Sequence, residues 1–142
     1  MKRIAVEKLI PQRAPVMMVD ELLEAEENGA EVSLLVRPDN YFMDEDGRLD
    51  EVGLIEHIAQ SASALAGCKA LAEGVENPPL GYIGEVKRFK CHFRPCAGDL
   101  LHTMISVVAD AGGVTLIQGV TRVGDRMAAE TQMKIFVKPW QS

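Results

Sequence analysis

The fold is decided by the stretch Glu51–Ala72, which reads EVGLIEHIAQSASALAGCKALA. Asp50 precedes it as an N-cap residue, and an acidic residue in the first turn, Glu51, is favoured by the helix dipole. Between His57 and Lys69 the stretch carries no charge, and most of its side chains are small. Because a surface helix carries a polar stripe, we predict a buried helix over these residues. Its small side chains would let another backbone come close.

Extended segments flank this helix on both sides. Two strands of a hairpin are predicted before it, joined by a turn at Asn28-Gly29, at Val16–Glu24 and Glu31–Val36. Four more are predicted after it, at Leu80–Phe93, Leu100–Ala109, Val114–Val123 and Met127–Val137. A short helical segment over Arg3–Ile10 would end at Pro11. The order predicts an α+β fold, a single domain over residues 1–142 in which a curved antiparallel sheet wraps around the central helix.

Composition excludes several classes of protein. The chain has 142 residues, which suits one domain. Its net charge of −6 argues against a nucleic-acid-binding protein, and its three cysteines argue against a secreted disulfide scaffold. The longest uncharged stretch outside the loops, Ile58–Cys68, is too short to span a membrane. We therefore expect a cytoplasmic protein that binds neither nucleic acid nor membrane.

Several motifs resemble those of the 3-hydroxyacyl-acyl-carrier-protein dehydratases of the FabA/FabZ type. Leu9–Asp20, LIPQRAPVMMVD, resembles their N-terminal signature, and Leu54–Gln60, LIEHIAQ, resembles their central-helix motif. Tyr82–Gly84, Phe89–Pro95 and Gly98-Asp99 follow the family pattern downstream. The resemblance implies a hotdog fold and a homodimer or higher homo-oligomer with its sites at the subunit interface. It also implies acyl chains on acyl carrier protein or coenzyme A as ligands, without a cofactor.

Both histidines of the family pattern are absent from this chain. The family's catalytic histidine lies in the loop before the central helix, where an ungapped alignment places Phe42. The acidic DEDG-L stretch resembles a divergent branch tied to aryl-polyene-like pathways, in which the histidine of the N-terminal motif would act instead. That position is Gln12 here. We keep Gln12 as a catalytic candidate and Phe42 as a substrate-binding candidate, and the general base is missing.

The chemistry and the resemblance together favour Glu56 as an acid. Dehydration needs a base for the C2 proton, an acid for the departing hydroxyl and donors for the thioester oxygen. Glu56 has apolar neighbours in the helix, and Gln60, four residues on, shares its face and could orient it. Backbone N–H groups for the substrate are expected at Val52, Gly53 and Gly84. The alternatives are a mere dipole contact for the carboxylate and a structural hydrogen bond for the glutamine.

The remaining histidines and cysteines are expected to be structural. His57 points about 100° away from the candidate acid around the helix, so we expect an interface or surface contact for it. His92 and His102 lie in predicted strands without a partner motif. Cys91 and Cys96 flank His92 at a spacing that fits no zinc pattern, so no metal site is predicted.

A basic cluster lies in the second half of an otherwise acidic chain, at Lys87, Arg88, Lys90 and Arg94. Such a rim would raise the encounter rate with an acidic carrier protein, so we predict carrier-protein docking there. The alternative is a solvated strand face.

Three functions follow from these observations. The first is a dehydratase-like protein acting on 3-hydroxyacyl thioesters in fatty-acid or polyketide/aryl-polyene-type synthesis. The second is a non-catalytic protein that binds acyl chains or a carrier protein, or pairs with an active dehydratase subunit. The third is an acyl thioesterase that uses one carboxylate and a water. Whether the chain is an active enzyme is left open by its sequence.

Overall fold

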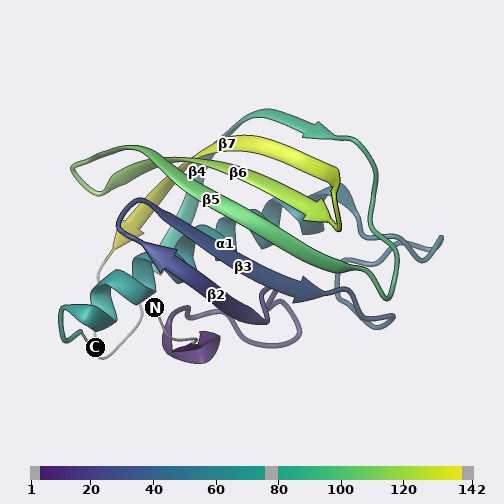
Figure 1. The fold of residues 1–142 in the computed structure, drawn as a ribbon, viewed down its shortest axis with the longest axis horizontal. Coiled ribbons are helices and arrows are strands. Elements are labelled where there is room, and N and C mark those ends of the chain that lie inside the picture. Colours follow the sequence, from purple (N-terminus) through teal and green to yellow (C-terminus); the bar gives the residue numbers. More distant parts are fainter. Residues whose placement is uncertain (1–3, 76–79, 139–142) are drawn as a thin grey trace.

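One long helix, α1 (Glu51–Ala72), is wrapped by a seven-stranded antiparallel sheet in the computed structural model, which describes residues 4–75 and 80–138 (Figure 1). The strands in chain order are β1 (Ile4–Ala5), β2 (Glu21–Glu26), β3 (Gly29–Leu35), β4 (Leu80–Cys91), β5 (Leu100–Ala111), β6 (Val114–Val123) and β7 (Arg126–Lys138). In space they run β1-β2-β3-β5-β6-β7-β4, so β4 forms one edge of the sheet. The predicted architecture, a curved antiparallel sheet around a long helix, is confirmed.

The helix begins and ends where the sequence predicts. The Asp50 carboxylate accepts a hydrogen bond from the Val52 N–H at 2.8 Å and thereby caps the first turn. The chain leaves the helix through Gly74, whose φ of +87° suits a residue without a side chain. Of the described helices, none is both long and apolar enough to cross a lipid bilayer.

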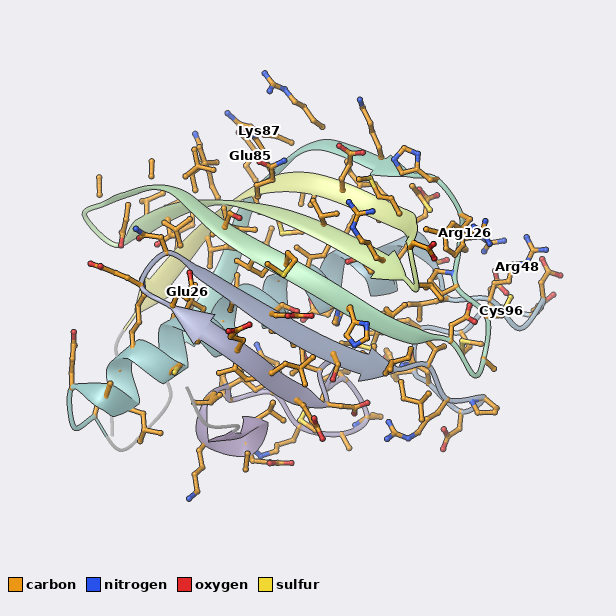
Figure 2. The ribbon with its side chains drawn as sticks, in the orientation of Figure 1. Glu26, Arg48, Glu85, Lys87, Cys96 and Arg126 are labelled. Atoms are coloured by element: carbon orange, nitrogen blue, oxygen red, sulfur yellow. The ribbon has the colours of Figure 1, made fainter. Side chains whose placement is uncertain are left out.

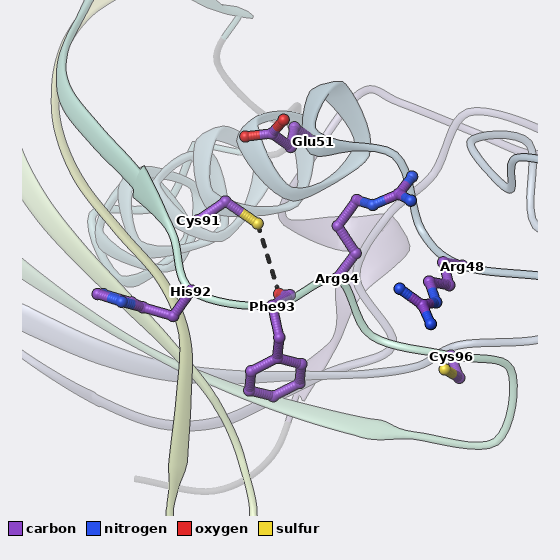
Figure 3. A pocket seen from close by; sticks show the side chains of 7 residues that line it. All are labelled: Arg48, Glu51, Cys91, His92, Phe93, Arg94 and Cys96. Atoms are coloured by element: carbon purple, nitrogen blue, oxygen red, sulfur yellow. Dashed lines mark hydrogen bonds between the residues drawn. The ribbon is translucent and has the colours of Figure 1, made fainter.

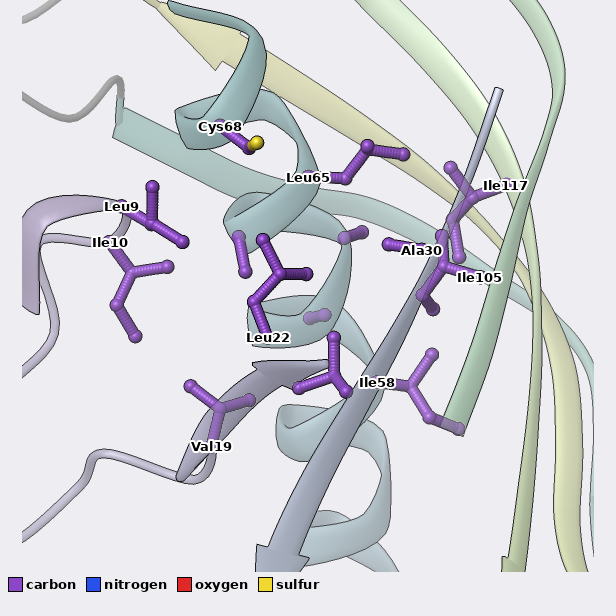
Figure 4. Packing of buried hydrophobic residues seen from close by; sticks show 14 of the residues in the cluster. Leu9, Ile10, Val19, Leu22, Ala30, Ile58, Leu65, Cys68, Ile105 and Ile117 are labelled. Carbon is purple, nitrogen blue, oxygen red and sulfur yellow. The ribbon is translucent and has the colours of Figure 1, made fainter. Parts of the chain in front are cut away.

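The helix is buried because the apolar faces of the strands pack around it. Ile58 and Leu65 of α1 meet Leu22 of β2, Ile105 of β5 and Ile117 of β6 in the main core (Figure 4). A Cβ atom added to Gly67 would lie 1.9 Å from the Leu9 carbonyl oxygen. The prediction that small helix residues let another backbone come close is therefore confirmed at this glycine.

The first hairpin differs from its prediction at both ends. Its first strand was expected over Val16–Glu24, but β2 covers Glu21–Glu26, and the two-residue turn is Glu27-Asn28. The segment before β2 lies outside the ladder because side chains of α1, rather than a neighbouring strand, bind the peptide groups of Met18. Alternating hydrophobicity cannot reveal that kind of partner.

The N-terminal helical segment is shorter than predicted. Within the described part of Arg3–Ile10, Ile4–Ala5 forms β1 and Val6–Lys8 forms one turn of 3₁₀ helix, while Arg3 lies outside the described residues. Arg13 holds the chain after this turn, since its guanidinium donates hydrogen bonds to the carbonyls of Glu7 and Ile10 at 2.8 and 2.7 Å. This local network fixes the residues just before and after Pro11.

The later strands agree with their predicted ranges within a few residues. β6 has the predicted bounds, β5 extends to Ala111, and β7 covers Arg126–Lys138. β4 ends at Cys91, two residues before the predicted end, although the N–H groups of His92 and Phe93 still donate to the Ala128 carbonyl of β7. Its ladder with β7 has two register shifts, and Arg88 in the second has a φ of +52°. The edge strand is thus irregular.

We expect Gly67→Ala to destabilise the protein by about 1–3 kcal/mol, since the new methyl group would overlap the Leu9 carbonyl. Helix propensity alone predicts the opposite sign, a gain of up to about 1 kcal/mol. Urea unfolding of the variant measures the difference, and Ala70→Gly in the same helix calibrates the propensity effect. A Gly67→Ala variant as stable as the wild type would contradict the close approach.

Candidate active site

Glu56 lies in the second turn of α1 and faces a small cavity. The cavity has a volume of about 210 Å³ and lies between the helix, the N-terminal segment and the edge strand. Its lining residues are Gln12, Glu56, Ala59, Gln60, Ser63, Gly81, Tyr82, Ile83 and Ile135. All three catalytic candidates from the sequence, Gln12, Glu56 and Gln60, therefore line one cavity. Helical spacing predicts the pair on the helix, and the fold adds the N-terminal residue.

Gln60 holds Glu56 in place. Its side chain is almost completely buried and has a hydrogen bond for each of its polar hydrogens. The amide nitrogen donates to the Val16 carbonyl at 2.8 Å and to Glu56 Oε1 at 3.0 Å, while Oε1 accepts from the Met18 N–H at 2.6 Å. Glu56 Oε1 must therefore act as an acceptor. A proton on this carboxyl group would be carried by Oε2.

Gln12 reaches the cavity from the segment that follows the 3₁₀ turn. Its backbone carbonyl accepts a hydrogen bond from Arg13 Nη1 at 2.8 Å. Its side-chain oxygen is buried and has no hydrogen-bond partner among the described residues. Gln12 thus lines the same cavity as Glu56 and carries a buried acceptor without a donor.

His57 is a buried core residue, so the expected surface or interface contact is wrong. Its Nδ1 lies 2.6 Å from the Met18 carbonyl oxygen, and its Nε2 lies 2.7 Å from Thr103 Oγ1, which in turn lies 2.7 Å from Thr121 Oγ1. Because a carbonyl only accepts, Nδ1 carries the hydrogen and Nε2 accepts from Thr103. Burial lowers the pKa of His57 to about 4, so the ring is neutral near pH 7. The residue joins the sheet to the N-terminal segment.

The four substrate-binding candidates lie outside the lining of the Glu56 cavity. Phe42 packs beside Gly53 at the start of α1, where an added Cβ would lie 2.6 Å from the Phe42 Cβ. Val52, in the same turn, is 59% exposed. Gly84 lies under the ring of Phe136, and an added Cβ would lie 2.0 Å from that ring. Close packing accounts for both glycines, and a role in substrate binding stays a prediction for all four residues.

A second, more open cavity of about 520 Å³ lies beside the first turn of α1 (Figure 3). Its lining residues are Arg48, Glu51, Cys91, His92, Phe93, Arg94 and Cys96. Arg94 pairs with Asp44. Hydrogen bonds from backbone N–H groups lower the pKa of the Asp44 carboxyl, and the bond from Arg48 has the largest effect. Burial raises the pKa of the Cys91 thiol, which donates to the Phe93 carbonyl. No group of three or more potential ligands in the described ranges could hold a metal ion.

The basic cluster is only partly available to a partner. Lys87 Nζ lies 3.2 Å from Glu85, and the two side chains lie together beside the edge strand (Figure 2). The pairing of Arg94 with Asp44 fixes the loop before α1. Arg88 and Lys90 are exposed. Three of the four docking candidates thus lie on β4, while Arg94 has a structural partner.

Sequence reasoning missed part of the cavity wall. Ser63 lies two turns after Glu56, and an added Cβ on Gly81 would lie 2.6 Å from its Oγ. Tyr82 and Ile83 belong to the downstream motif of the resemblance, which is the signal in the sequence for this wall. Alternation along the last predicted strand puts Ile135 on the core face, but the sequence does not indicate that it lines this cavity.

The comparisons with known proteins agree with this architecture. The family model for the ApeP dehydratase, ApeP-like, matches residues 4–141. The chain is 30% identical over 136 residues to the 3-hydroxyacyl-acyl-carrier-protein dehydratase FabZ of Verminephrobacter eiseniae, with 91% of this chain and 89% of that protein covered. The resemblance to dehydratases of the FabA/FabZ type is therefore confirmed.

Two solved structures share the fold. The dehydratase heterocomplex ApeI:P from Xenorhabdus doucetiae has a TM-score of 0.88 at 17% identity, covering 97% of this chain and 93% of that one. A hypothetical thioesterase from Streptococcus pneumoniae, solved with coenzyme A, has a TM-score of 0.65 at 12% identity, covering 85% and 87%. The predicted hotdog fold is confirmed.

We expect acid to destabilise the protein through His57. The unfolded chain takes up a proton near the ordinary pKa of 6.5, but the buried ring does so only near pH 4. The difference in pKa stabilises the folded state fully above pH 6.5. This contribution to the free energy of unfolding, on the order of 3 kcal/mol, is lost as the pH falls toward 4.

The ring signals of His57 in an NMR titration give its pKa directly, and unfolding at several pH values gives the stability. His57→Gln should flatten the pH dependence between these limits. A His57 ring that titrates near pH 6.5 in the folded protein would contradict the buried neutral state.

Proposed function

Since the chain belongs to the ApeP-like dehydratase family, we propose that it acts on 3-hydroxyacyl thioesters and that Glu56 protonates their departing hydroxyl group. The observation that carries this proposal is the pairing of Glu56 with Gln60 at the wall of the cavity. Gln60 occupies Oε1 and leaves Oε2 for the proton. A positioned acid of this kind contributes about 10²–10⁴ in rate. The acyl group would be presented by acyl carrier protein or coenzyme A, in the cytoplasm.

The base that removes the C2 proton must come from outside the described cavity wall. Glu56 and Tyr82 are the ionisable side chains among its described lining residues, and that wall includes no histidine. The wall also includes Gly81 and Ile83 of β4, which is the edge of the sheet. A second chain that pairs along β4 would complete the cavity and could bring in the missing base. We therefore assign the functional unit to an oligomer, in the first instance a homodimer.

A heteromeric dehydratase is the second candidate, and the missing base favours it. In a homodimer the base would come from this same sequence, whose three histidines include His57, which is neutral and bonded in the core. A partner of different sequence has no such restriction. The solved ApeI:P complex is named as a dehydratase heterocomplex, which supports considering this arrangement here.

Docking of an acidic carrier protein on the exposed cations of β4 fits the same arrangement. Arg88 and Lys90 are exposed on the strand whose other end, at Gly81 and Tyr82, lines the Glu56 cavity. A carrier bound at one end of β4 would hold its acyl arm near the other. Charge complementarity of this kind acts mainly on the association rate.

We expect the purified protein to convert a 3-hydroxyacyl-carrier substrate to the enoyl thioester, and Glu56→Gln to lower the rate by about 10²–10⁴. Glu51→Gln, the same change one turn earlier on α1, should leave the rate unchanged. The measurement is mass spectrometry of the carrier-bound product, with light scattering to give the oligomeric state.

The product that forms distinguishes the dehydratase from the thioesterase and from the heteromeric enzyme. Free acid instead of enoyl thioester would show thioester hydrolysis. Binding without turnover by the homo-oligomer, followed by turnover once a second dehydratase chain is added, would show a heteromeric enzyme. Enoyl product formed equally well by Glu56→Gln would contradict the role of this carboxyl group.

Reversal of charge at Lys87 and Arg88, to Glu at both positions, should weaken carrier-protein binding by roughly tenfold at low salt, and less at high salt. Reversal at Lys8 and Lys69 changes the net charge by the same amount elsewhere and should have little effect. Titration of labelled carrier protein at two ionic strengths measures both variants. Equal loss of affinity in the two double variants would exclude docking on β4.

A further inference from the structure

The side-chain oxygen of Gln12 is a buried acceptor without a donor. Among buried side-chain nitrogen and oxygen atoms of the described residues, it is the one that has no hydrogen-bond partner. Buried polar groups in proteins are rarely left unbonded, and such an atom calls for an explanation. Gln12 lines the Glu56 cavity, so a ligand bound in that cavity is a candidate for the missing donor.

We propose that Gln12 accepts a hydrogen bond from the 3-hydroxyl group of the acyl chain and thereby makes the cavity selective for hydroxylated acyl groups. The inference rests on the proposed function, since it takes the ligand to be an acyl thioester. It adds a residue that determines specificity, distinct from the acid.

The other amide in the cavity cannot take this role. Gln60 uses both amide hydrogens on Val16 and Glu56, and its oxygen is bonded to the Met18 N–H. The oxygens left to bind a ligand by hydrogen bonds are therefore Gln12 Oε1 and Glu56 Oε2. A hydroxyl group matches this pair, because its hydrogen can be donated to Gln12 while its oxygen accepts from a protonated Glu56. A keto oxygen or a methylene group has no hydrogen to donate to Gln12.

The backbone that carries Gln12 is held in place before any ligand binds. The guanidinium of Arg13 donates to the backbone carbonyls of Glu7, Ile10 and Gln12, at 2.8, 2.7 and 2.8 Å. These bonds fix the turn that carries the glutamine. A fixed acceptor discriminates well, because a ligand without the donor leaves the buried oxygen unbonded. An amide oxygen does not titrate, so Gln12 remains an acceptor at every pH used for the binding measurement.

The test compares three pantetheine-linked acyl probes by calorimetry. The probes share one chain length and carry at C3 a hydroxyl, a keto group or two hydrogens. An amide replaces the thioester, so the C2 proton is less acidic and the probes are not turned over. We expect the wild type to bind the hydroxyl probe roughly ten- to hundredfold more tightly than the other two. Gln12→Met, of similar length but without the amide, should bind the hydroxyl and keto probes alike.

Several outcomes would overturn the proposal. These are equal binding of the three probes by the wild type, binding of none of them, and a preference for the hydroxyl over the keto probe that persists in Gln12→Met. Loss of the preference in Tyr82→Phe but not in Gln12→Met would assign the selectivity to the tyrosine instead. Gln12→Leu serves as a second variant without the amide, and thermal unfolding establishes which variants are folded.

The proposal and the proposed function can fail separately. Selective binding of the hydroxyl probe with no enoyl product in the activity assay would leave Gln12 as a specificity residue in a non-catalytic binding protein. Enoyl product with no selectivity in the binding assay would keep the enzyme and remove the role of Gln12.

Discussion

The peptide groups of Met18 lie between two buried side chains of α1, and the rest of the site depends on this contact. The N–H of Met18 donates to Gln60 and its carbonyl accepts from His57. Buried polar side chains need such partners, so the helix and the N-terminal segment fix each other. Through Gln60 the same contact also fixes Glu56. The geometry of the cavity therefore starts from one residue that contributes no chemistry of its own.

The parts of the fold that depend on local patterns could be predicted from the sequence. The bounds of α1 follow from Asp50 and from the run of small uncharged residues, and β6 follows from its flanking glycines. The start of β2 and the edge position of β4 depend on contacts between distant segments. Neither the alternation of side chains nor the spacing of turns carries that information.

The candidate site was predictable to a similar extent. The spacing of Glu56 and Gln60 on one helix face is a local property, and the resemblance to dehydratases added Gln12. The burial of His57 was missed because a helical wheel gives the direction of a side chain but not what covers it. In this chain that direction is covered by Met18 and Thr103, and both come from other parts of the sequence.

The irregular ladder of β4 limits how further chains can add to this sheet. A regular edge strand accepts a neighbour at any offset of two residues, because its donors and acceptors repeat with that period. Each register shift in β4, one at Gly84 and one at Arg88, breaks the repeat. Few offsets remain, and long stacks of chains, as in amyloid, are disfavoured. The edge can thus stay open for one specific neighbour without a large risk of aggregation.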